Sequence, residues 1–463
     1  MLTKEQITEL KNKGNGDLAY LVNKHQDSGN LAFILDNLGH LPKNFNGDFL
    51  INLLKHEHYL VRLSAVKNIG KIHQEKYLFL LMEAFENEVN TIVRREIISS
   101  IGRMRNPKNK NFLFKILEDH DPKVVCQAIR ALLVFEKENE IVEKLKPLLN
   151  HQNETVRNFI YKEFFANQEN KDSTSLPHTE TYDFLKNVVV NGDVLEVLKY
   201  VPNESVHLTF TSPPYYNARD YSIYPSYQDY LEFLEQVFVE THRITKEGRF
   251  LVVNTSPIII PRVSRSHSSK RYPIPFDLHG YLVKNGWEFI DDIVWLKPEY
   301  SVKNRIGGFM QHRKPLGYKP NSVTEYLMVY RKETTKLIDW NMKSYDSQII
   351  KESKVEDGYE TTNVWKIDPK FDKIHSAVFP VELCKRVIQY YSFKGDLVFD
   401  PFAGSGTVGK TAKSLGRKFF LTEKESTYFE YMKSKAKPNS SMFGEPETQF
   451  FWTMEEFVNH VLP

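Results

Sequence analysis

Apolar and polar positions follow two different periods along the chain. In the amino-terminal third, apolar residues recur at the spacing of amphipathic helices, as in Phe49, Leu50, Leu53 and Leu54. After residue 182, apolar runs of strand length alternate with amphipathic stretches of helical length. The pattern therefore predicts an all-helical domain followed by an α/β domain.

The helical patterns of the first part recur every 31 or 32 residues. One register aligns Asn37-Leu38-Gly39 with Asn68-Ile69-Gly70 and Ser100-Ile101-Gly102, and an independent register aligns the valines at positions 61, 93, 124 and 156. This repeat resembles HEAT-type helix pairs, which stack to bury a core that no single unit can provide. We expect about five units over residues 20–168, within a repeat domain of residues 1–168.

Residues 169–182 are polar and aperiodic, and we expect them to link the repeats to a second domain over residues 183–463. That domain opens with a strand at 187–193, a helical pattern through Val201 and a strand at 206–210. This order predicts a parallel sheet with right-handed crossovers. Later segments continue the alternation: helix 228–244, a polar turn at 246–249, strand 250–254, helix 276–285, strands 290–296 and 325–330, helix 381–388, and strands 396–399 and 419–422. The expected fold class is α/β, a doubly wound Rossmann-like sheet.

Composition narrows the class of protein. The chain has 463 residues, of which 41% are hydrophobic and 26% are charged, as in globular proteins with more than one domain. It contains no run of about 18 apolar residues and no secretory leader, so we expect a cytoplasmic protein without a membrane partner. The two cysteines, Cys126 and Cys384, are too few for a disulfide framework or a cysteine-based zinc site, and no metal site is predicted. Because the net charge is only +3, any surface that binds a polyanion must be local.

The stretch with the clearest chemistry is Thr211-Ser212-Pro213-Pro214-Tyr215, which follows the strand at 206–210. Strand ends are where open α/β sheets present catalytic groups. The two prolines form a stiff turn whose carbonyls have no competing N–H donors. Together with the Ser212 hydroxyl and the Tyr215 ring, these acceptors suit a flat ring that carries an exocyclic amine. Hydrogen bonds from both amine N–H groups would draw the nitrogen toward tetrahedral geometry, in which it is nucleophilic.

A second motif, Asp400-Pro401-Phe402-Ala403-Gly404-Ser405-Gly406-Thr407-Val408-Gly409, joins the strand at 396–399 to a helix. Glycines at such a turn allow a ligand to approach the backbone and the helix N-terminus closely. Glu423 ends the next strand, where a carboxylate can hold ribose hydroxyls. The glycines also fit the G-x-G-x-x-G dinucleotide pattern. A nicotinamide-dependent oxidoreductase is therefore an alternative, although it leaves the Pro-Pro turn unexplained.

The first motif resembles the catalytic motif of amino-group DNA methyltransferases, and Asp-Pro-Phe-Ala-Gly-Ser-Gly resembles their S-adenosylmethionine loop. Residues 375–380 are similar to the element that covers the methionine end of this cofactor, and the order of the motifs resembles the β-type permutation. The resemblance extends over residues 187–435. It implies catalytic roles for Ser212, Pro213, Pro214 and Tyr215. It implies cofactor-binding roles for Asp193, Phe379, Pro380, Asp400, Pro401, Phe402, Gly404, Ser405, Gly406, Thr407 and Glu423. For Asp193, a helix N-cap is an equally good interpretation.

This resemblance implies an S-adenosylmethionine-dependent enzyme that methylates a base in double-stranded DNA within a restriction-modification system. The target base is expected to flip out of the duplex and stack on Tyr215. Methylation at cytosine C5 requires an attacking thiolate. Both cysteines fall in helical patterns and not in an active-site turn, so methylation at C5 is not expected. Ser212 in place of aspartate resembles the branch that acts on cytosine N4, with adenine N6 as the alternative. A non-catalytic DNA-binding adaptor is a further alternative, which the intact motifs disfavour.

Three segments, residues 256–274, 297–321 and 331–374, are expected as target-recognition insertions. The first two are basic and contain aromatic residues, and Lys297 begins the second of them. They are expected to form a groove for the phosphate backbone, with solvated surface loops as the alternative. The predicted DNA-binding residues are Arg219, Arg262, Arg265, Lys270, Arg271, Lys303, Arg305, Arg313 and Lys314.

Arginines also recur at one position of the repeat, at Arg62, Arg94 and Arg157. A solenoid offers an extended concave surface, on which these residues could bind a partner protein or the DNA backbone. Alternatively, they pair with groups inside the stack. A single fixed position in each unit favours this second interpretation.

Overall fold

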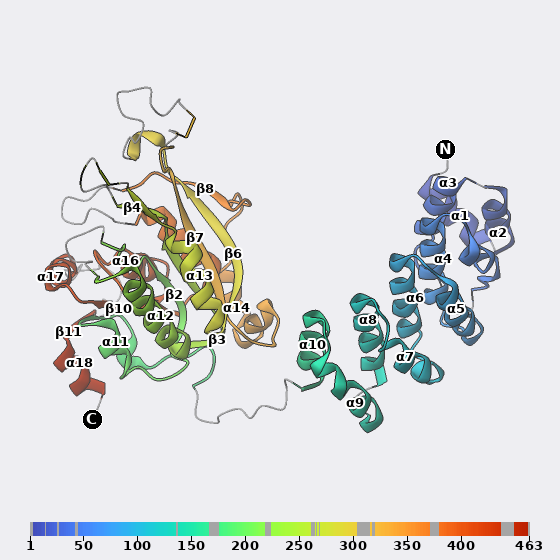
Figure 1. The fold of residues 1–463 in the computed structure, drawn as a ribbon, viewed down its shortest axis with the longest axis horizontal. Coiled ribbons are helices and arrows are strands. Elements are labelled where there is room, and N and C mark those ends of the chain that lie inside the picture. Colours follow the sequence, from blue (N-terminus) through green and yellow to red (C-terminus); the bar gives the residue numbers. More distant parts are fainter. Residues whose placement is uncertain are drawn as a thin grey trace. The chain divides into compact units, whose positions relative to one another are not determined.

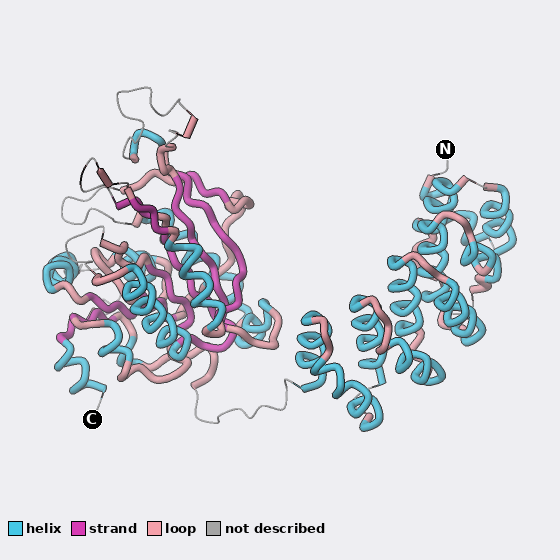
Figure 2. Tube along the Cα trace, viewed as in Figure 1, coloured by secondary structure: helices cyan, strands magenta, loops and turns pink. Residues whose placement is uncertain are grey.

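The computed structural model describes residues 3–13, 15–25, 27–41, 45–135, 138–165, 176–217, 224–260, 264, 266–267, 269–302, 315–316, 320–370, 379–436 and 449–461. They form two compact units, Met1–Lys171 and Asp172–Pro463. The first is helical and the second combines helices with a sheet (Figure 1, Figure 2). Among the described residues, no helix is both long and apolar enough to cross a membrane.

The first unit consists of α-helices joined by short turns. Their bounds are α1 Lys4–Lys13, α2 Asn15–Lys24, α3 Ser28–Asp36, α4 Tyr59–Ile72, α5 Glu75–Asn87, α6 Thr91–Arg103, α7 Lys110–Ile116, α8 Pro122–Leu132, α9 Asn139–Leu145 and α10 Glu154–Ile160. Short 3-10 helices occupy Asp48–Leu50, Asn52–Lys55, Pro107–Asn109, Leu133–Phe135 and Lys146–Asn150, and a π-helical turn occupies Tyr161–Phe165. Polar side chains set several helix starts, because Asp27, Asn90, Asp121 and Asn153 each accept a hydrogen bond from a backbone N–H in the first turn.

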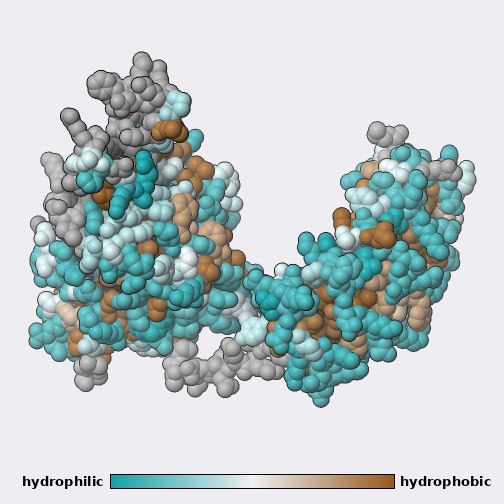
Figure 3. All heavy atoms as spheres, in the orientation of Figure 1, coloured by the Kyte–Doolittle hydropathy of each residue, from teal (hydrophilic) through white to brown (hydrophobic). Residues whose placement is uncertain are grey.

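The repeat predicted from the sequence is a stack of helices with one continuous core. Helices α4, α6, α8 and α10 pack against one another in succession (Figure 1). A Cβ atom on Gly70 would lie 2.6 Å from Ser100 Cβ, and one on Gly102 would lie 2.7 Å from Ala131 Cβ. Gly70 and Gly102 therefore allow neighbouring helices to approach closely. The visible surface of this unit is mainly hydrophilic, with smaller hydrophobic groups (Figure 3).

The recurring arginines pair within the stack, as the second interpretation predicted. The Arg62 guanidinium donates to both Glu88 carboxylate oxygens, at 2.7 and 2.9 Å, and to two backbone carbonyls. Arg94 forms an ion pair with Asp119 and also donates to backbone carbonyls. Arg157 donates to the carbonyls of residues 151 and 152, at 2.6 and 2.9 Å. These guanidinium groups are therefore engaged in holding the turns between helices.

The described residues of the second unit form a nine-stranded sheet of order β11-β1-β10-β9-β2-β3-β7-β6-β8. The strands are β1 Val188–Asn191, β2 Val206–Thr211, β3 Thr245–Thr255, β6 Trp287–Leu296, β7 Thr324–Lys332, β8 Val364–Lys366, β9 Leu397–Asp400, β10 Lys418–Glu423 and β11 Phe450–Thr453. Among these described strands, β7 runs antiparallel to both of its neighbours and the other pairings are parallel. A separate antiparallel pair is formed by β4 Ile258–Ile260 and β5 Lys270–Tyr272.

Helices cover both faces of the sheet, which confirms the doubly wound α/β class. Their bounds are α11 Val194–Leu198, α12 Tyr227–Ile244, α13 Ile274–Lys284, α14 Ser347–Glu352, α15 Val381–Tyr391, α16 Thr407–Ser414, α17 Ser426–Lys435 and α18 Met454–Val461. Val398 packs in the core formed with α15, α16 and α17, whereas Leu397 and Phe399 pack in the core formed with α11, α12 and α18. This alternation along β9 is the pattern of a strand buried on both faces.

Two predicted segments differ from the structure. Residues 246–249, expected as a polar turn, belong to β3, and Lys246 and Arg249 are only 1% and 2% exposed. The stretch 331–374, expected as a target-recognition insertion, is polar and without clear periodicity in the sequence, yet it contains α14 and adds β8 as an edge strand beside β6. In both segments the local polarity misled the prediction, because tertiary contacts supply the partners that the polar groups need.

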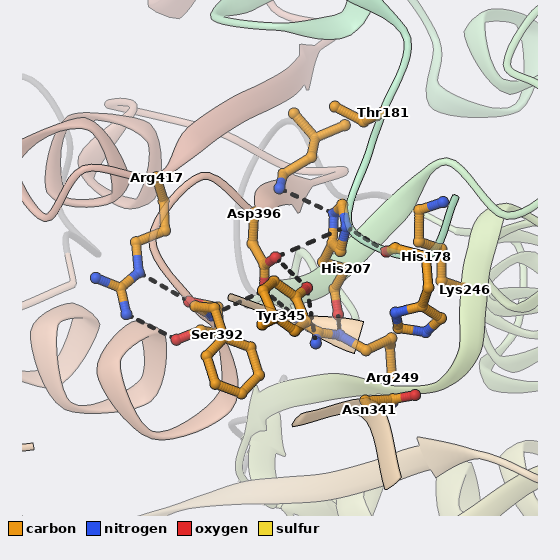
Figure 4. A network of polar contacts seen from close by, with 12 residues as sticks. His178, Thr181, His207, Lys246, Arg249, Asn341, Tyr345, Ser392, Asp396 and Arg417 are labelled. Atoms are coloured by element: carbon orange, nitrogen blue, oxygen red, sulfur yellow. Dashed lines mark hydrogen bonds and ion pairs between the residues drawn. The ribbon is translucent and has the colours of Figure 1, made fainter. Parts of the chain in front are cut away.

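A buried polar network explains the first difference (Figure 4). Arg249 forms an ion pair with Asp396, whose Oδ1 also accepts a hydrogen bond from the Tyr345 hydroxyl at 2.5 Å. His207 accepts a hydrogen bond from the Leu397 N–H at 3.0 Å and contacts the carbonyl of His178 at 3.0 Å. Buried charges persist only when paired. The network therefore fastens β2, β3 and β9 together near the amino ends of β2 and β9.

Candidate active site

The predicted motifs lie at one edge of the sheet. The Ser-Pro-Pro-Tyr turn follows β2, the glycine loop follows β9, and Glu423 ends β10. Asn191 at the end of β1 is in register with Glu423, and Leu421 on β10 is in register with Asp400. Because these strands are parallel, their carboxyl ends meet at the same edge.

A pocket of about 460 Å³ brings the two motifs together. Its lining includes Ser212, Pro213, Pro214 and Tyr215 together with Asp193, Phe379, Asp400, Pro401, Phe402, Gly404, Ser405, Thr407 and Glu423. Pro380 and Gly406 do not line it: Pro380 is buried and precedes α15, and Gly406 precedes α16 with a φ of 72°. Gly192, Tyr224, Phe233 and Tyr428 also line the pocket, although the sequence did not single them out.

The glycine loop is held by Glu423. Glu423 Oε2 accepts a hydrogen bond from the Gly404 N–H at 2.7 Å, and Oε1 accepts one from the Glu425 N–H at 2.8 Å. Gly404 and Gly406 have φ angles of 51° and 72°, a region that favours glycine. Burial raises the pKa of the Glu423 carboxyl. The carboxylate therefore shapes the loop as well as facing the pocket.

Asp400 connects the two motifs directly. The Thr211 hydroxyl, next to Ser212, donates a hydrogen bond to Asp400 Oδ1 at 2.7 Å, and the Phe402 N–H donates to the same oxygen at 3.1 Å. Burial of Asp400 raises its pKa to about 7. This bond fixes the end of β2 against the start of the glycine loop.

Asp193 has the helix N-cap role that the sequence left open. Its Oδ1 accepts a hydrogen bond from the Leu195 N–H at 3.0 Å, and its Oδ2 lies 3.2 Å from Lys424 Nζ. Since Asp193 also lines the pocket, the cap places a carboxylate at the wall of the pocket.

The turn after β2 contacts residues that sequence reasoning missed. Asn254 Nδ2 lies 3.5 Å from Ser212 Oγ and 2.6 Å from Glu325 Oε2, and the Tyr215 hydroxyl donates to the same Glu325 oxygen at 3.3 Å. Lys297, counted among the basic residues of the second loop, forms an ion pair with Glu325. Their positions in the sequence could have pointed to these two residues, because Asn254 ends one predicted strand and Glu325 begins another.

Neither the cysteines nor Lys270 and Arg271, the two predicted DNA contacts that the structure describes, line the pocket. Cys384 is fully buried on α15 and Cys126 is on α8, and neither lines the pocket. Lys270 and Arg271 are exposed on β5. The other predicted DNA-binding residues fall outside the described residues; they are Arg219, Arg262, Arg265, Lys303, Arg305, Arg313 and Lys314. Segment 371–378, which precedes Phe379, also falls outside them.

Comparison with known proteins identifies the family. The sequence model of the DNA methylase family matches residues 206–434, and that of HEAT repeats matches residues 80–161. The type II methyltransferase M.Cfr9I of Citrobacter freundii is 30% identical over 270 residues, which cover 51% of this chain and 83% of that protein. The chain belongs to the DNA methylase family. Its helical unit contains the HEAT repeats that the sequence predicted.

Further relatives of this methylase differ in length. The type II beta methyltransferase M.BslI of Bacillus sp. (strain NEB-606) is 27% identical over 406 residues. The match covers 80% of this chain, so it extends into the repeats, but this chain spans only 43% of M.BslI. The structure of TTHA0409 from Thermus thermophilus in complex with S-adenosyl-L-methionine is 26% identical, with a TM-score of 0.44, and covers 54% of this chain and 92% of that one.

S-adenosylmethionine is the cofactor of this methylase family, and the pocket fits it. The volume is that of a small-molecule site. The carboxyl groups of Asp193, Asp400 and Glu423 line the pocket and suit a cationic sulfonium. Phe379 stacks on Phe210 with ring centroids 4.7 Å apart and provides an apolar wall.

Proposed function

We propose that this chain is a site-specific DNA methyltransferase that modifies the exocyclic N4 of cytosine in double-stranded DNA within a restriction-modification system. One observation carries the proposal: the Ser-Pro-Pro-Tyr turn and the glycine loop, almost 190 residues apart, line the same pocket. Similarity to the type II methyltransferases M.BslI and M.Cfr9I supports the assignment.

The residues of the turn would activate the amine of an extruded base. Ser212 Oγ and the Pro213 carbonyl accept the two amine N–H groups, and the ring of Tyr215 stacks on the base. Accepting both bonds localises the nitrogen lone pair, which otherwise is delocalised into the base. Bound S-adenosylmethionine supplies the electrophilic methyl group.

The other wall of the pocket would hold the cofactor. Glu423 accepts from the ribose hydroxyls while it keeps the Gly404 N–H in place. Asp193, Asp400 and the hydroxyls of Ser405 and Thr407 bind the polar parts, and Phe379 excludes water from the reacting atoms. Close approach of the two ligands then supplies much of the rate.

Ser212 supports cytosine as the target base. In a family in which aspartate at this position is usual for adenine N6, a serine resembles the cytosine N4 branch. Exposed Lys270 and Arg271 support phosphate binding by the 256–274 segment. The basic residues of the second segment that are expected to act with them are Lys303, Arg305, Arg313 and Lys314.

The direct test is to incubate the full-length protein with unmodified genomic DNA and S-adenosylmethionine, followed by sequencing that reports the modified base and its context. We expect N4-methylcytosine in one short sequence. N6-methyladenine would contradict the base assignment, and unmodified DNA would contradict methyl transfer altogether.

A further inference from the structure

A cluster of polar side chains from three other strands surrounds the Ser-Pro-Pro-Tyr turn. Asn254 is at the end of β3, Glu325 is at the start of β7, and Lys297 directly follows β6. Glu325 is at the centre, because one carboxylate oxygen accepts from Asn254 and Tyr215 while the other pairs with Lys297. The side chains of Glu325 and Lys297 are only 15% and 17% exposed, so water screens their interaction weakly.

Glu325 determines the orientation of the Asn254 amide. The Asn254 side chain is buried, with the residue 2% exposed. Its Nδ2 donates a hydrogen bond to Glu325 Oε2 at 2.6 Å and lies 3.5 Å from Ser212 Oγ. A flipped amide would place Oδ1 against the carboxylate, where two acceptors would meet. Among the described residues, Oδ1 has no hydrogen-bond partner that would favour either orientation. The carboxylate therefore keeps an N–H facing Ser212.

Glu325 also holds the far end of the Tyr215 ring. The Tyr215 hydroxyl donates to Glu325 Oε2 at 3.3 Å. Burial and the nearby charge of Glu325 raise the pKa of Tyr215, so the phenol remains protonated and keeps its donor. Anchoring the hydroxyl fixes the tilt of the ring on which a base would stack.

We propose that Glu325, held by Lys297, is a positioning residue that orients Ser212 through Asn254 and fixes the tilt of Tyr215. The inference rests on the proposed function, since it assigns a role within the same site. Glu325 and Asn254 do not line the pocket, so they act through the two residues that do.

Glu325→Gln tests this role because it keeps the shape of the side chain. Its amide N–H must face either the Lys297 ammonium or the donors of Asn254 and Tyr215, and both arrangements are unfavourable. We expect kcat to fall about ten- to a hundredfold, whereas KM for DNA and the dissociation constant of S-adenosylmethionine change less than about twofold. Adding Lys297→Met removes the ammonium, lets the amide oxygen face Asn254 and Tyr215, and should restore most of kcat.

Glu247 provides a matched control on the same β3 strand as Asn254. It also pairs with a lysine, Lys336, and accepts a hydrogen bond from the Thr334 hydroxyl at 2.7 Å, but it lies near the opposite end of β3. Glu247→Gln should lower the melting temperature and leave kcat unchanged.

The experiment measures kcat and KM on unmodified DNA, cofactor affinity by calorimetry and the melting temperature for each full-length variant. A wild-type kcat in Glu325→Gln, a parallel loss of cofactor affinity, or a double variant no faster than the single would overturn the inference. If Glu325→Gln does not fold, the single variant Lys297→Met tests the proposal. It removes the ion pair that holds Glu325, so kcat should fall, and a wild-type kcat would contradict the proposal. Methyl transfer that is absent from the wild-type protein overturns the proposed function itself.

Discussion

At the residue scale, the pocket has two chemically distinct walls. Ser212 and Pro213 provide neutral acceptors and Tyr215 provides an aromatic ring, whereas Asp193, Asp400 and Glu423 present carboxyl groups. A neutral amine is best matched by the first wall and a cationic sulfonium by the second. The hydrogen bond from the Thr211 hydroxyl to Asp400 holds the two walls together.

Ser212→Ala tests the first wall. Removing the hydroxyl takes away one acceptor for the amine but leaves the carboxyl wall intact. We expect kcat to fall about a hundredfold or more, with the dissociation constant of S-adenosylmethionine within about twofold of wild type. Single-turnover kinetics and calorimetry measure the two quantities, and an unchanged kcat would refute the role of Ser212.

At the scale of elements, helix spacing in the stack depends on glycine. Gly70 and Gly102 recur with the repeat because the next helix lies against them, and their α-helical partners leave no room for a Cβ atom. The repeat predicted from the sequence registers therefore has a physical basis in helix packing. The registers alone did not show that Ser100 contacts Gly70 or that Ala131 contacts Gly102.

Gly102→Ala and Gly280→Ala should have opposite effects on stability. A Cβ at Gly102 would lie 2.7 Å from Ala131 Cβ, so overpacking should lower the free energy of unfolding of the repeat unit by about 1–3 kcal/mol. Gly280 lies in α13 and is exposed, and a Cβ atom there would meet no other atom within 4 Å. Alanine at this position should therefore add up to about 1 kcal/mol through helix propensity. Chemical denaturation measures both changes, and equal signs would contradict this account.

At the scale of the whole molecule, the two units have different predicted tasks. The methylase unit contains the pocket, and the recurring arginines of the repeat unit are engaged in internal contacts. The charge needed for DNA binding is therefore expected from the loops of the methylase unit.

Replacing Arg62, Arg94 and Arg157 together with glutamine should destabilise the repeat unit without weakening DNA binding. Each arginine caps backbone carbonyls, and two of them pair with carboxylates. Circular dichroism should show a lower melting temperature, and fluorescence anisotropy an unchanged affinity for DNA. A strong loss of affinity in a folded variant would instead support the concave surface as the DNA contact.

The stability of the methylase unit should decrease in acid. Burial lowers the pKa of His207 to about 3 and of His178 to about 4, from 6.5 in the unfolded chain. Their contribution is complete above pH 6.5 and is lost as the pH falls toward these values, because the unfolded state binds the protons first. Asp400, with its pKa raised to about 7, acts in the opposite direction and loses its contribution as the pH rises from about 4 to 7.

Glu423, whose pKa burial also raises, acts with Asp400, and His242, whose pKa burial lowers, acts with the other two histidines. With three histidines opposing two carboxyl groups, we expect a lower melting temperature at pH 5 than at pH 7.5. His178→Gln keeps a donor for the Glu247 carbonyl but cannot be protonated, so it should reduce this difference. Calorimetric scans at both pH values check the prediction, and equal pH sensitivity of the variant and the wild type would contradict it.

The sequence by itself determined the repeat period, the α/β class and the two motifs that line the pocket. These features are local, because helix and strand periodicity and the turn geometry of proline and glycine depend on neighbouring residues. Both motifs follow predicted strands, and in the structure both line one pocket at the carboxyl edge of the sheet.

Only the tertiary structure decided which distant side chains meet. It paired Arg62 with Glu88, buried Arg249 against Asp396, and brought Asn254 and Glu325 to the Ser-Pro-Pro-Tyr turn. Such contacts depend on strand order and register, and many orders and registers satisfy the same hydrophobic pattern. A polar residue can therefore be expected on the surface from its sequence and still be buried, once the fold supplies its partner.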